Sequence, residues 1–334
     1  MKQKRIFDDQ LIVITGGAGF IGSCVIRYLN DKGLSNLLIV DDLNDSNKWR
    51  NLVGKSFADI IPKSEIFNFL KGREREIEAF VHLGACSSTT ETDADYLLNN
   101  NYRFSVKLAE YALKYEQRFI YASSAATYGN GEQGFSDNEK DLKSLRPLNM
   151  YGYSKHLFDL WAQKEKVLDQ IVGLKYFNVF GPNEYHKKDM ASMIYKMFAV
   201  ANSGKPIKLY KSNDPKYKDG EQLRDFIYVK DAVKMTCELL TDAFKDVSGI
   251  FNIGSGKPIT WNTIANALFA ALGKPAKIEY IDMPDNLDDQ YQNYTCADMT
   301  KYNKIHGLDS TKCMSIEDAV KDYVQNYLMK NWTW

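Results

Sequence analysis

A tyrosine and a lysine stand four positions apart in the segment Tyr151-Gly-Tyr-Ser-Lys155. On a helix this spacing places both side chains on one face, about one turn apart. A free phenol has a pKa of about 10, and a lysine cation beside it would favour the phenolate. The pair therefore indicates a base that takes a proton from an alcohol, although the same spacing is common on ordinary helix surfaces.

A hydroxyl upstream of this pair adds to the possible chemistry. The run Phe119-Ile-Tyr-Ala-Ser-Ser124 predicts a strand that ends in two serines. We expect Ser124 to hydrogen-bond the reacting oxygen, although a serine at such a point also serves as a simple turn or cap residue. Ser124, Tyr151 and Lys155 thus form a candidate catalytic set.

Three glycines follow the first predicted strand, the apolar run Leu11-Ile-Val-Ile14. Gly16, Gly19 and Gly22 open a helix predicted to start near Gly19, where absent side chains let backbone N–H groups approach a pyrophosphate. About twenty residues later Asp41 ends the second predicted strand, at the position that meets the adenosine ribose. Together these features predict a nicotinamide-dinucleotide site. The charge of the nicotinamide ring, together with the Lys155 cation, would favour the Tyr151 phenolate.

The residues near the ribose leave the choice of dinucleotide open. Asp41 and Asp42 favour the free 2′-hydroxyl of NAD. Lys48, Arg50 and Lys63 favour the 2′-phosphate of NADP, although they are also ordinary surface cations. From these residues alone, both cofactors are compatible with the sequence.

Strand-like and helix-like segments alternate through the first half of the chain, which predicts an α/β fold with a Rossmann-type, doubly wound parallel sheet. We expect this dinucleotide-binding domain over residues 1–180, with later strands around 225–255 that could return to it, and a smaller, mixed substrate-binding lobe over 181–334. The expected helices cover 102–115, 153–165, 190–202, 229–241 and 260–272, and the expected surface loop covers 214–222.

Charge and cysteine usage narrow the function classes. Lys plus Arg and Asp plus Glu number 43 each, so no net field draws the protein to nucleic acid or to an anionic membrane. The five cysteines are scattered and lack metal-ligand spacing, which favours a reducing cytoplasm and predicts no metal. A small polar substrate is the expected partner.

Several motifs together resemble the extended short-chain dehydrogenase/reductase family, also described as the NAD-dependent epimerase/dehydratase family. The resemblance runs over nearly the whole chain, and further strings make it similar to the nucleotide-sugar epimerases of that family. The motifs are Thr15-Gly-Gly-Ala-Gly-Phe-Ile-Gly22, Tyr121-Ala-Ser-Ser-Ala-Ala-Thr-Tyr-Gly129, Tyr151-Gly-Tyr-Ser-Lys155, Tyr176-Phe-Asn-Val-Phe-Gly-Pro182 and the more specific Gly84-Ala-Cys-Ser-Ser-Thr-Thr-Glu91.

The resemblance implies an isomerase with bound NADP that acts on an ADP-heptose and assembles as a homo-oligomer. It gives Lys187 the role of a second acid/base group. To the three glycines and Asp41 it adds cofactor contacts from Phe20, Ile21, Asp42, Lys48, Lys63, Leu83, Gly84, Ala85, Cys86, Ser87, Asn100, Tyr151, Lys155, Val179 and Lys187. The implied substrate contacts are Ser124, Asn178, Asp189, Lys196, Tyr210, Asn213, Arg224 and Tyr291.

The implied reaction is inversion of the heptose at C6. That carbon has no adjacent carbonyl, so transient oxidation to a ketone is the expected route. A 4,6-dehydratase needs an acidic pair directly after the strand-end hydroxyl, where this chain has Ala125 and Ala126. Another epimerase, a simple reductase and a non-catalytic nicotinamide-sensing protein remain alternatives.

Overall fold

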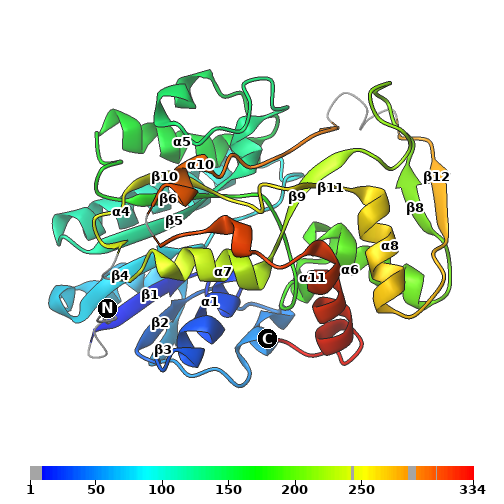
Figure 1. The fold of residues 1–334 in the computed structure, drawn as a ribbon. Helices are drawn as coiled ribbons and strands as arrows, with labels where there is room; N and C mark the ends of the chain where they lie inside the picture. Colours follow the sequence, from blue (N-terminus) through cyan, green and yellow to red (C-terminus); the bar gives the residue numbers. More distant parts are fainter. Residues whose placement is uncertain (1–9, 242–243, 285–290, 306) are drawn as a thin grey trace.

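The short apolar runs of the sequence form a seven-stranded parallel sheet (Figure 1). The computed structural model describes residues 10–241, 244–284, 291–305 and 307–334. The strand order is β10-β6-β5-β4-β1-β2-β3, which confirms the predicted doubly wound fold. The strands are β1 (Leu11–Thr15), β2 (Leu37–Val40), β3 (Asp59–Ile61), β4 (Ile77–His82), β5 (Arg118–Ser124), β6 (Val172–Tyr176) and β10 (Gly249–Ile253).

The order of the strands reverses next to β1, and this reversal locates a binding crevice. The chain proceeds from β1 outward to β2 and β3, and then returns to place β4 on the other side of β1. In open parallel sheets, ligands bind beyond the carboxyl ends of the strands at such a point. The residues at these ends are Thr15, His82 and, on β5, Ser124.

Helices cover both faces of the sheet because alternate strand residues point to opposite sides. On β1, Ile12 and Ile14 belong to the core beneath α1 and α7, whereas Leu11 and Val13 belong to the core beneath α2, α4 and α5. The helices of this part are α1 (Phe20–Asp31), α2 (Ile66–Leu70), α3 (Ala94–Leu97), α4 (Phe104–Lys114), α5 (Met150–Lys164), α7 (Val229–Glu238) and α10 (Thr300–Asn303). Within the described ranges, no helix has the length and apolarity needed to cross a membrane.

A smaller mixed lobe lies beside the sheet, at the right of Figure 1. It has a three-stranded sheet of order β11-β9-β7 and a pair of parallel strands, β12 and β8. Its helices α6 and α11 both pack on α8. The elements are β7 (Asn178–Phe180), α6 (Met193–Asn202), β8 (Ile207–Tyr210), β9 (Leu223–Tyr228), β11 (Pro258–Thr260), α8 (Trp261–Ala271), β12 (Ile278–Ile281) and α11 (Ile316–Asp322).

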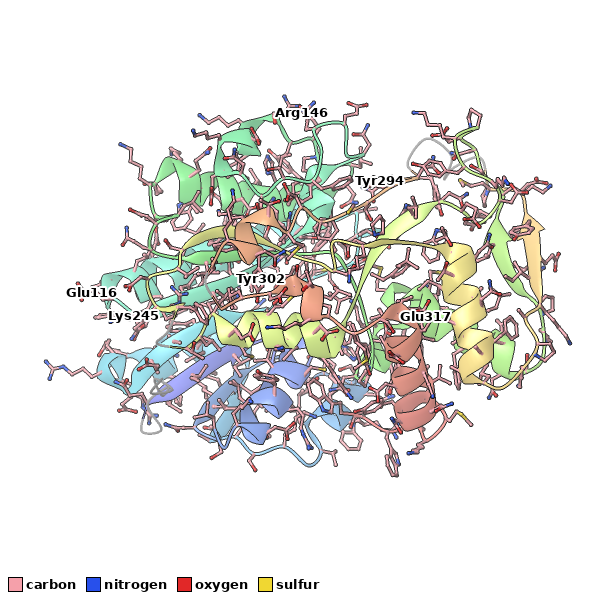
Figure 2. The ribbon with its side chains drawn as sticks, viewed as in Figure 1. Glu116, Arg146, Lys245, Tyr294, Tyr302 and Glu317 are labelled. Carbon is pink, nitrogen blue, oxygen red and sulfur yellow. The ribbon has the colours of Figure 1, made fainter. Side chains whose placement is uncertain are left out.

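The two parts share one hydrophobic core. A single cluster of buried side chains runs from Ile14 on β1 to Ile264 on α8. Tyr302, labelled beside α7 in Figure 2, is fully buried and bonds Glu238 Oε2 at 3.1 Å. Tyr294, on the segment between the two parts, packs its ring on Phe135 at 6.2 Å. The common cluster and the Tyr294 contact hold the smaller lobe against the sheet, whereas the Tyr302 bond joins α10 to α7.

Several short helices complete the described elements. Five of them carry residues of the candidate site: η1 (Asn47–Leu52), η2 (Lys63–Glu65), η4 (Leu98–Arg103), η5 (Ala125–Tyr128) and η7 (Tyr185–Met190). The others are η3 (Glu74–Glu76), η6 (Glu139–Ser144), η9 (Ser310–Lys312) and η10 (Tyr323–Leu328).

The ends of the expected helices differ from the observed ends where a cap decides them. The expected helix 153–165 starts earlier, at Met150, because the Asn149 side chain accepts a bond from Gly152 N at 2.8 Å. The expected helix 190–202 starts later, at Met193, because Ser192 is its cap. The segment 214–222 is a loop as expected, but its surface assignment was wrong at one end, since Gln222 is fully buried.

Candidate active site

Ser124 and Tyr151 are brought together by tight packing of α5 on the turn that follows β5. Ser124 ends the strand, and its Oγ accepts a bond from Ala126 N at 3.1 Å, which opens η5. A Cβ on Gly152 would lie 2.7 Å from Ala126 O, so only glycine allows the helix this close. The neighbouring Tyr151 phenol consequently reaches the Ser124 hydroxyl and hydrogen-bonds it.

Lys155 lies one turn further along α5 and points back to the sheet. Its Nζ donates to Ala122 O on β5 at 2.8 Å, and the side chain is 4% exposed. The helix therefore presents the predicted pair from one face, with the phenol near the strand end and the ammonium above the strand.

Burial opposes the protonation states expected from the sequence. It raises the pKa of Tyr151, and the bond from Ser124 lowers it only in part. Burial also lowers the pKa of Lys155 to about 8, against the opposing effect of Asp159. Among the protein's own groups, desolvation of Tyr151 exceeds the opposing bond from Ser124. The expected phenolate depends also on the charge of a bound nicotinamide ring, and it stays a prediction.

A cavity of about 340 Å³ opens beside Ser124 and Tyr151. It contains five of the predicted site residues, Ser124, Tyr151, Asn178, Arg224 and Tyr291. These come from β5, α5, β7, β9 and the segment after residue 290. The cavity is also lined by residues that were not predicted from the sequence, among them Thr89, Leu148, Gln292 and Thr295. Thr89 lies in the Ala-Cys-Ser-Ser-Thr-Thr string and Gln292 follows Tyr291, so motif membership was the signal available for both.

Arg224 gives this cavity a buried positive charge. It is 7% exposed, and its guanidinium lies over the Tyr291 ring at 5.0 Å. Burial lowers the pKa of Arg224. Tyr291 in turn meets Tyr210 edge to face, with ring centroids 6.3 Å apart. A cation among aromatic rings suits an anionic group carried by a flat, apolar ligand.

The glycine-rich loop has the close backbone packing that a pyrophosphate cradle requires. Gly16 has φ +68°, and a Cβ there would lie 2.7 Å from Gly84 N. A Cβ on Gly22 would overlap Gly16 O. Gly19 caps α1 without a side-chain hydrogen bond, so no side chain blocks the helix N-terminus there. These residues fit the dinucleotide predicted from the sequence.

The ribose-side residues pair with one another. Asp41 accepts from Ala18 N at 2.9 Å and from Lys48 Nζ at 2.7 Å. Asp42 accepts from Lys63 N at 3.0 Å, and Lys63 Nζ donates to Asn100 Oδ1 at 2.5 Å. Two predicted carboxylates and two predicted ammonium groups therefore lie together at the end of β2.

The segment after β4 is fixed to α5 by an asparagine that sequence reasoning missed. Asn101 Oδ1 accepts from Cys86 N, and Asn101 Nδ2 donates to Cys86 O, each at 2.9 Å. Asn101 Nδ2 also lies 3.0 Å from Ser154 Oγ. Gly84 N bonds Thr15 Oγ1 at 3.0 Å. The predicted residues Leu83, Gly84, Ala85, Cys86 and Ser87 thus run between the glycine-rich loop and α5.

Lys187 lies beside the glycine-rich loop instead of in the cavity lining. Its Nζ is 5.7 Å from the centre of the Phe20 ring, at the start of α1, and burial lowers its pKa. Asp189 and Lys196 bond each other at the surface, where Lys196 Nζ donates to Asp189 O at 2.5 Å. Of the remaining predicted residues, Ile21 follows Phe20, Val179 is on β7, and Asn213 Oδ1 accepts from Asn293 Nδ2 at 2.9 Å.

Comparison with known proteins agrees with this arrangement. The model of the NAD dependent epimerase/dehydratase family matches residues 12–254. The chain belongs to this family. It is 46% identical over 324 residues to the ADP-L-glycero-D-manno-heptose-6-epimerase of Nitratidesulfovibrio vulgaris (strain DP4). The matched region covers 95% of this chain and 98% of that protein.

Two solved structures of epimerases have the same fold as this chain. The ADP-L-glycero-D-manno-heptose-6-epimerase of Helicobacter pylori superposes with a TM-score of 0.77 at 29% identity, over 96% of each chain. The UDP-N-acetylglucosamine 4-epimerase of Methanobrevibacter ruminantium M1 gives 0.78 at 25% identity, over 97% of this chain and 100% of that one.

The two positions after Ser124 carry no acidic side chain in this member of the NAD dependent epimerase/dehydratase family. They are Ala125 and Ala126, and both line the cavity. Methyl groups neither donate nor accept a proton, so these positions offer no acid/base pair to expel water from a sugar. The site is therefore suited to moving a proton on and off one hydroxyl.

Proposed function

We propose that this enzyme inverts C6 of ADP-D-glycero-D-manno-heptose to give the L-glycero epimer, with NADP as its nicotinamide cofactor. The observation that carries the proposal is one cavity that joins Ser124 and Tyr151 to Asn178, Arg224 and Tyr291. The 46% identity to a curated ADP-L-glycero-D-manno-heptose-6-epimerase supports the choice of substrate.

The cavity residues divide into a reacting end and an anion-binding end. We assign Ser124 and Tyr151 to the hydroxyl on C6, since their hydroxyls hydrogen-bond each other there. We assign Arg224, with the rings of Tyr291 and Tyr210, to the ADP diphosphate and its base. A buried guanidinium binds phosphate oxygens with strong, charge-assisted hydrogen bonds.

Side chains of this protein carry out the proton transfer in the proposed reaction. When bound, the nicotinamide supplies reversible hydride acceptance at the sugar carbon, which makes a planar ketone accessible. Tyr151 takes the proton of the C6 hydroxyl, with Ser124 hydrogen-bonded to the same oxygen. Lys155, held on Ala122 O, supplies positive charge near the phenol, and a bound cationic ring would add to that charge.

Inversion requires that the hydride return to the opposite face of the same carbon, and that the ketone oxygen then regain a proton. We propose Lys187 as the group that exchanges a proton there. Burial lowers its pKa, which brings an ammonium closer to a value at which it releases and regains a proton. Its ammonium lies beside Phe20 at the start of α1, whereas Tyr151 lines the cavity, and we assign the two groups to opposite faces of the carbon.

The preference for NADP rests on the ribose-side ion pair. Lys48 neutralises Asp41, a carboxylate that would otherwise repel a 2′-phosphate. The Lys63 ammonium, which donates to the neutral amide of Asn100, is a second cation for that phosphate. Comparison of NADP and NAD dissociation constants for the wild type and for Lys48→Ala tests the preference. A loss confined to NADP is expected, and an equal loss for both cofactors would contradict it.

A second candidate is inversion of a different nucleotide sugar, since the chain also resembles a UDP-N-acetylglucosamine 4-epimerase. Incubation of the purified protein with ADP-D-glycero-D-manno-heptose, and in parallel with UDP-N-acetylglucosamine, separates the two. NMR should show C6 inversion of the heptose without added cofactor turnover. Conversion of only the UDP-sugar would reject the proposed substrate, and stoichiometric consumption of NADPH would indicate a reductase.

We further propose that the protein works in the cytoplasm as a homo-oligomer. The five cysteines Cys24, Cys86, Cys237, Cys296 and Cys313 are all free thiols, as a reducing compartment would keep them. Sedimentation of the purified protein tests the assembly. A species larger than the monomer is expected, and a monomer at micromolar concentration would contradict the proposal.

A further inference from the structure

Asn51 lies where the glycine-rich loop meets the segment that carries Lys187. It is 3% exposed and sits on η1. Its Nδ2 lies 3.0 Å from Ala18 O in the glycine-rich loop, 3.1 Å from Asn183 O and 3.3 Å from His186 Nδ1. One amide group therefore joins both segments.

The segment 181–192 is anchored on its other side by Glu184. This buried carboxylate accepts bonds from Gly181 N at 3.2 Å, from Ser192 Oγ at 2.8 Å and from Tyr323 OH at 2.9 Å. Lys187 N donates to Glu184 O at 2.9 Å. The substrate-lobe side of the segment is thus fixed independently of Asn51.

In this pair we assign the acceptor role to His186 Nδ1, which places the proton of a neutral ring on Nε2. An amide has two N–H groups, and here three acceptors lie within 3.3 Å of its nitrogen. A protonated Nδ1 would replace the third acceptor by a donor. Burial, with Lys187 and Lys48 nearby, lowers the pKa of His186 to about 4, so the ring is neutral near pH 7.

We infer that Asn51 is a positioning residue for Lys187. By joining Ala18 O to Asn183 O and His186, it holds the Lys187 side chain over Phe20, beside the glycine-rich loop. Asn51 acts through this segment and contacts no reacting group. The inference rests on the proposed function of Lys187 as the second proton-transfer group.

A double-mutant cycle with Asn51→Ala and Lys187→Ala tests the inference. Lys187→Ala alone should lower kcat at least about tenfold. Asn51→Ala should also lower kcat at least about tenfold, with KM within about threefold, because small misplacements of a catalytic group are costly. In the Lys187→Ala background, Asn51→Ala should add less than about twofold, since residues that act through one another are not additive.

Asn30→Ala is the matched control. Asn30 lies at the other end of α1, and its Nδ2 also donates to two backbone carbonyls, Leu34 O and Ser56 O, each at 2.8 Å. Its kcat should stay within about twofold of the wild type. An equal loss of kcat from Asn51→Ala in both backgrounds would overturn the inference, because Asn51 would then act independently of Lys187.

A measurement on the wild type covers the case in which Asn51→Ala fails to fold. The ¹⁵N shifts of His186 at pH 7 should show an unprotonated Nδ1, and a protonated Nδ1 would overturn the inference. An active wild type with a fully active Asn51→Ala variant rejects the inference alone. Inactivity of the wild type on the heptose substrate rejects the proposed function, and the positioning role with it.

Discussion

Ser124 and Tyr151 meet at the edge of the sheet because Ser124 ends β5 and Tyr151 lies in the first turn of α5. Burial raises the pKa of the Tyr151 phenol, and the bond from Ser124 lowers it only in part. The order of strand and helix in the sequence predicts that the two side chains meet. Spacing along a helix contains no information on how completely water is excluded from the phenol, so this effect of burial could not be predicted.

Replacement of Tyr151 by Phe isolates the contribution of the phenol at this scale. The ring keeps its packing and loses only the hydroxyl that bonds Ser124. We expect kcat to fall about 100-fold or more, as for loss of a general base, with the NADP dissociation constant within about threefold. Single-turnover kinetics and fluorescence titration measure the two quantities. Wild-type turnover by Tyr151→Phe would remove the phenol from the reaction.

Elements were predicted best where periodicity and glycine spacing agree. The run Leu11–Thr15 and the helix from Phe20 were confirmed, because a buried strand and a glycine turn each have a strong local signature. The contact of Asn101 with Cys86 had no such signature. Leu98–Arg103 is a π-type helix, which shifts the facing positions and turns Asn101 toward Cys86.

The start of α1 should not tolerate a side chain at Gly22. In Gly22→Ala the new Cβ overlaps Gly16 O, so the loop must move. We expect the NADP dissociation constant to rise at least about tenfold and stability to fall by about 1–3 kcal/mol. Gly33→Ala is the control at the far end of the helix, where φ is +85° but the space is open. A similar NADP affinity for both variants would contradict the cradle.

Buried His82 on β4 should make stability depend on acid pH. It lies between Thr15 Oγ1 at 2.6 Å and Ser105 Oγ at 2.7 Å, and burial lowers its pKa to about 3. The unfolded chain, with a pKa of about 6.5, binds the proton first, so stability falls as pH drops from about 6.5 to 3, by on the order of 4 kcal/mol. Urea unfolding should show a flatter pH profile for His82→Gln, and an equally steep profile would exclude this source.

At the scale of the whole molecule, the sequence predicted two parts but not how they join. Alternation of strands and helices gave the large sheet, whereas the common core, the buried Gln222 and the cavity between β5, β7 and β9 depend on contacts between distant segments. Such contacts leave no periodic pattern in one sequence. The expected boundary at residue 180 and the homo-oligomer remain predictions.

A buried ion pair links α5 to β6, the strand next to the edge strand β10. Lys175 Nζ lies 3.0 Å from Asp159 Oδ2, and both side chains are fully buried. Lys175→Met leaves Asp159 without its cation and should lower the free energy of unfolding by about 3–5 kcal/mol. Lys175→Met with Asp159→Asn should recover part of this loss in urea unfolding. An additive loss in the double variant would contradict the pairing as the cause.

The most direct test of the proposed inversion follows a deuterium label at C6. ADP-D-glycero-D-manno-heptose with deuterium at that carbon is incubated with the purified enzyme in ordinary water, and the product is analysed by NMR and mass spectrometry. Transient oxidation and return of the same hydride predicts the L-glycero epimer with deuterium retained at C6. Inversion with loss of the deuterium to solvent, or no inversion at all, would contradict the proposed function.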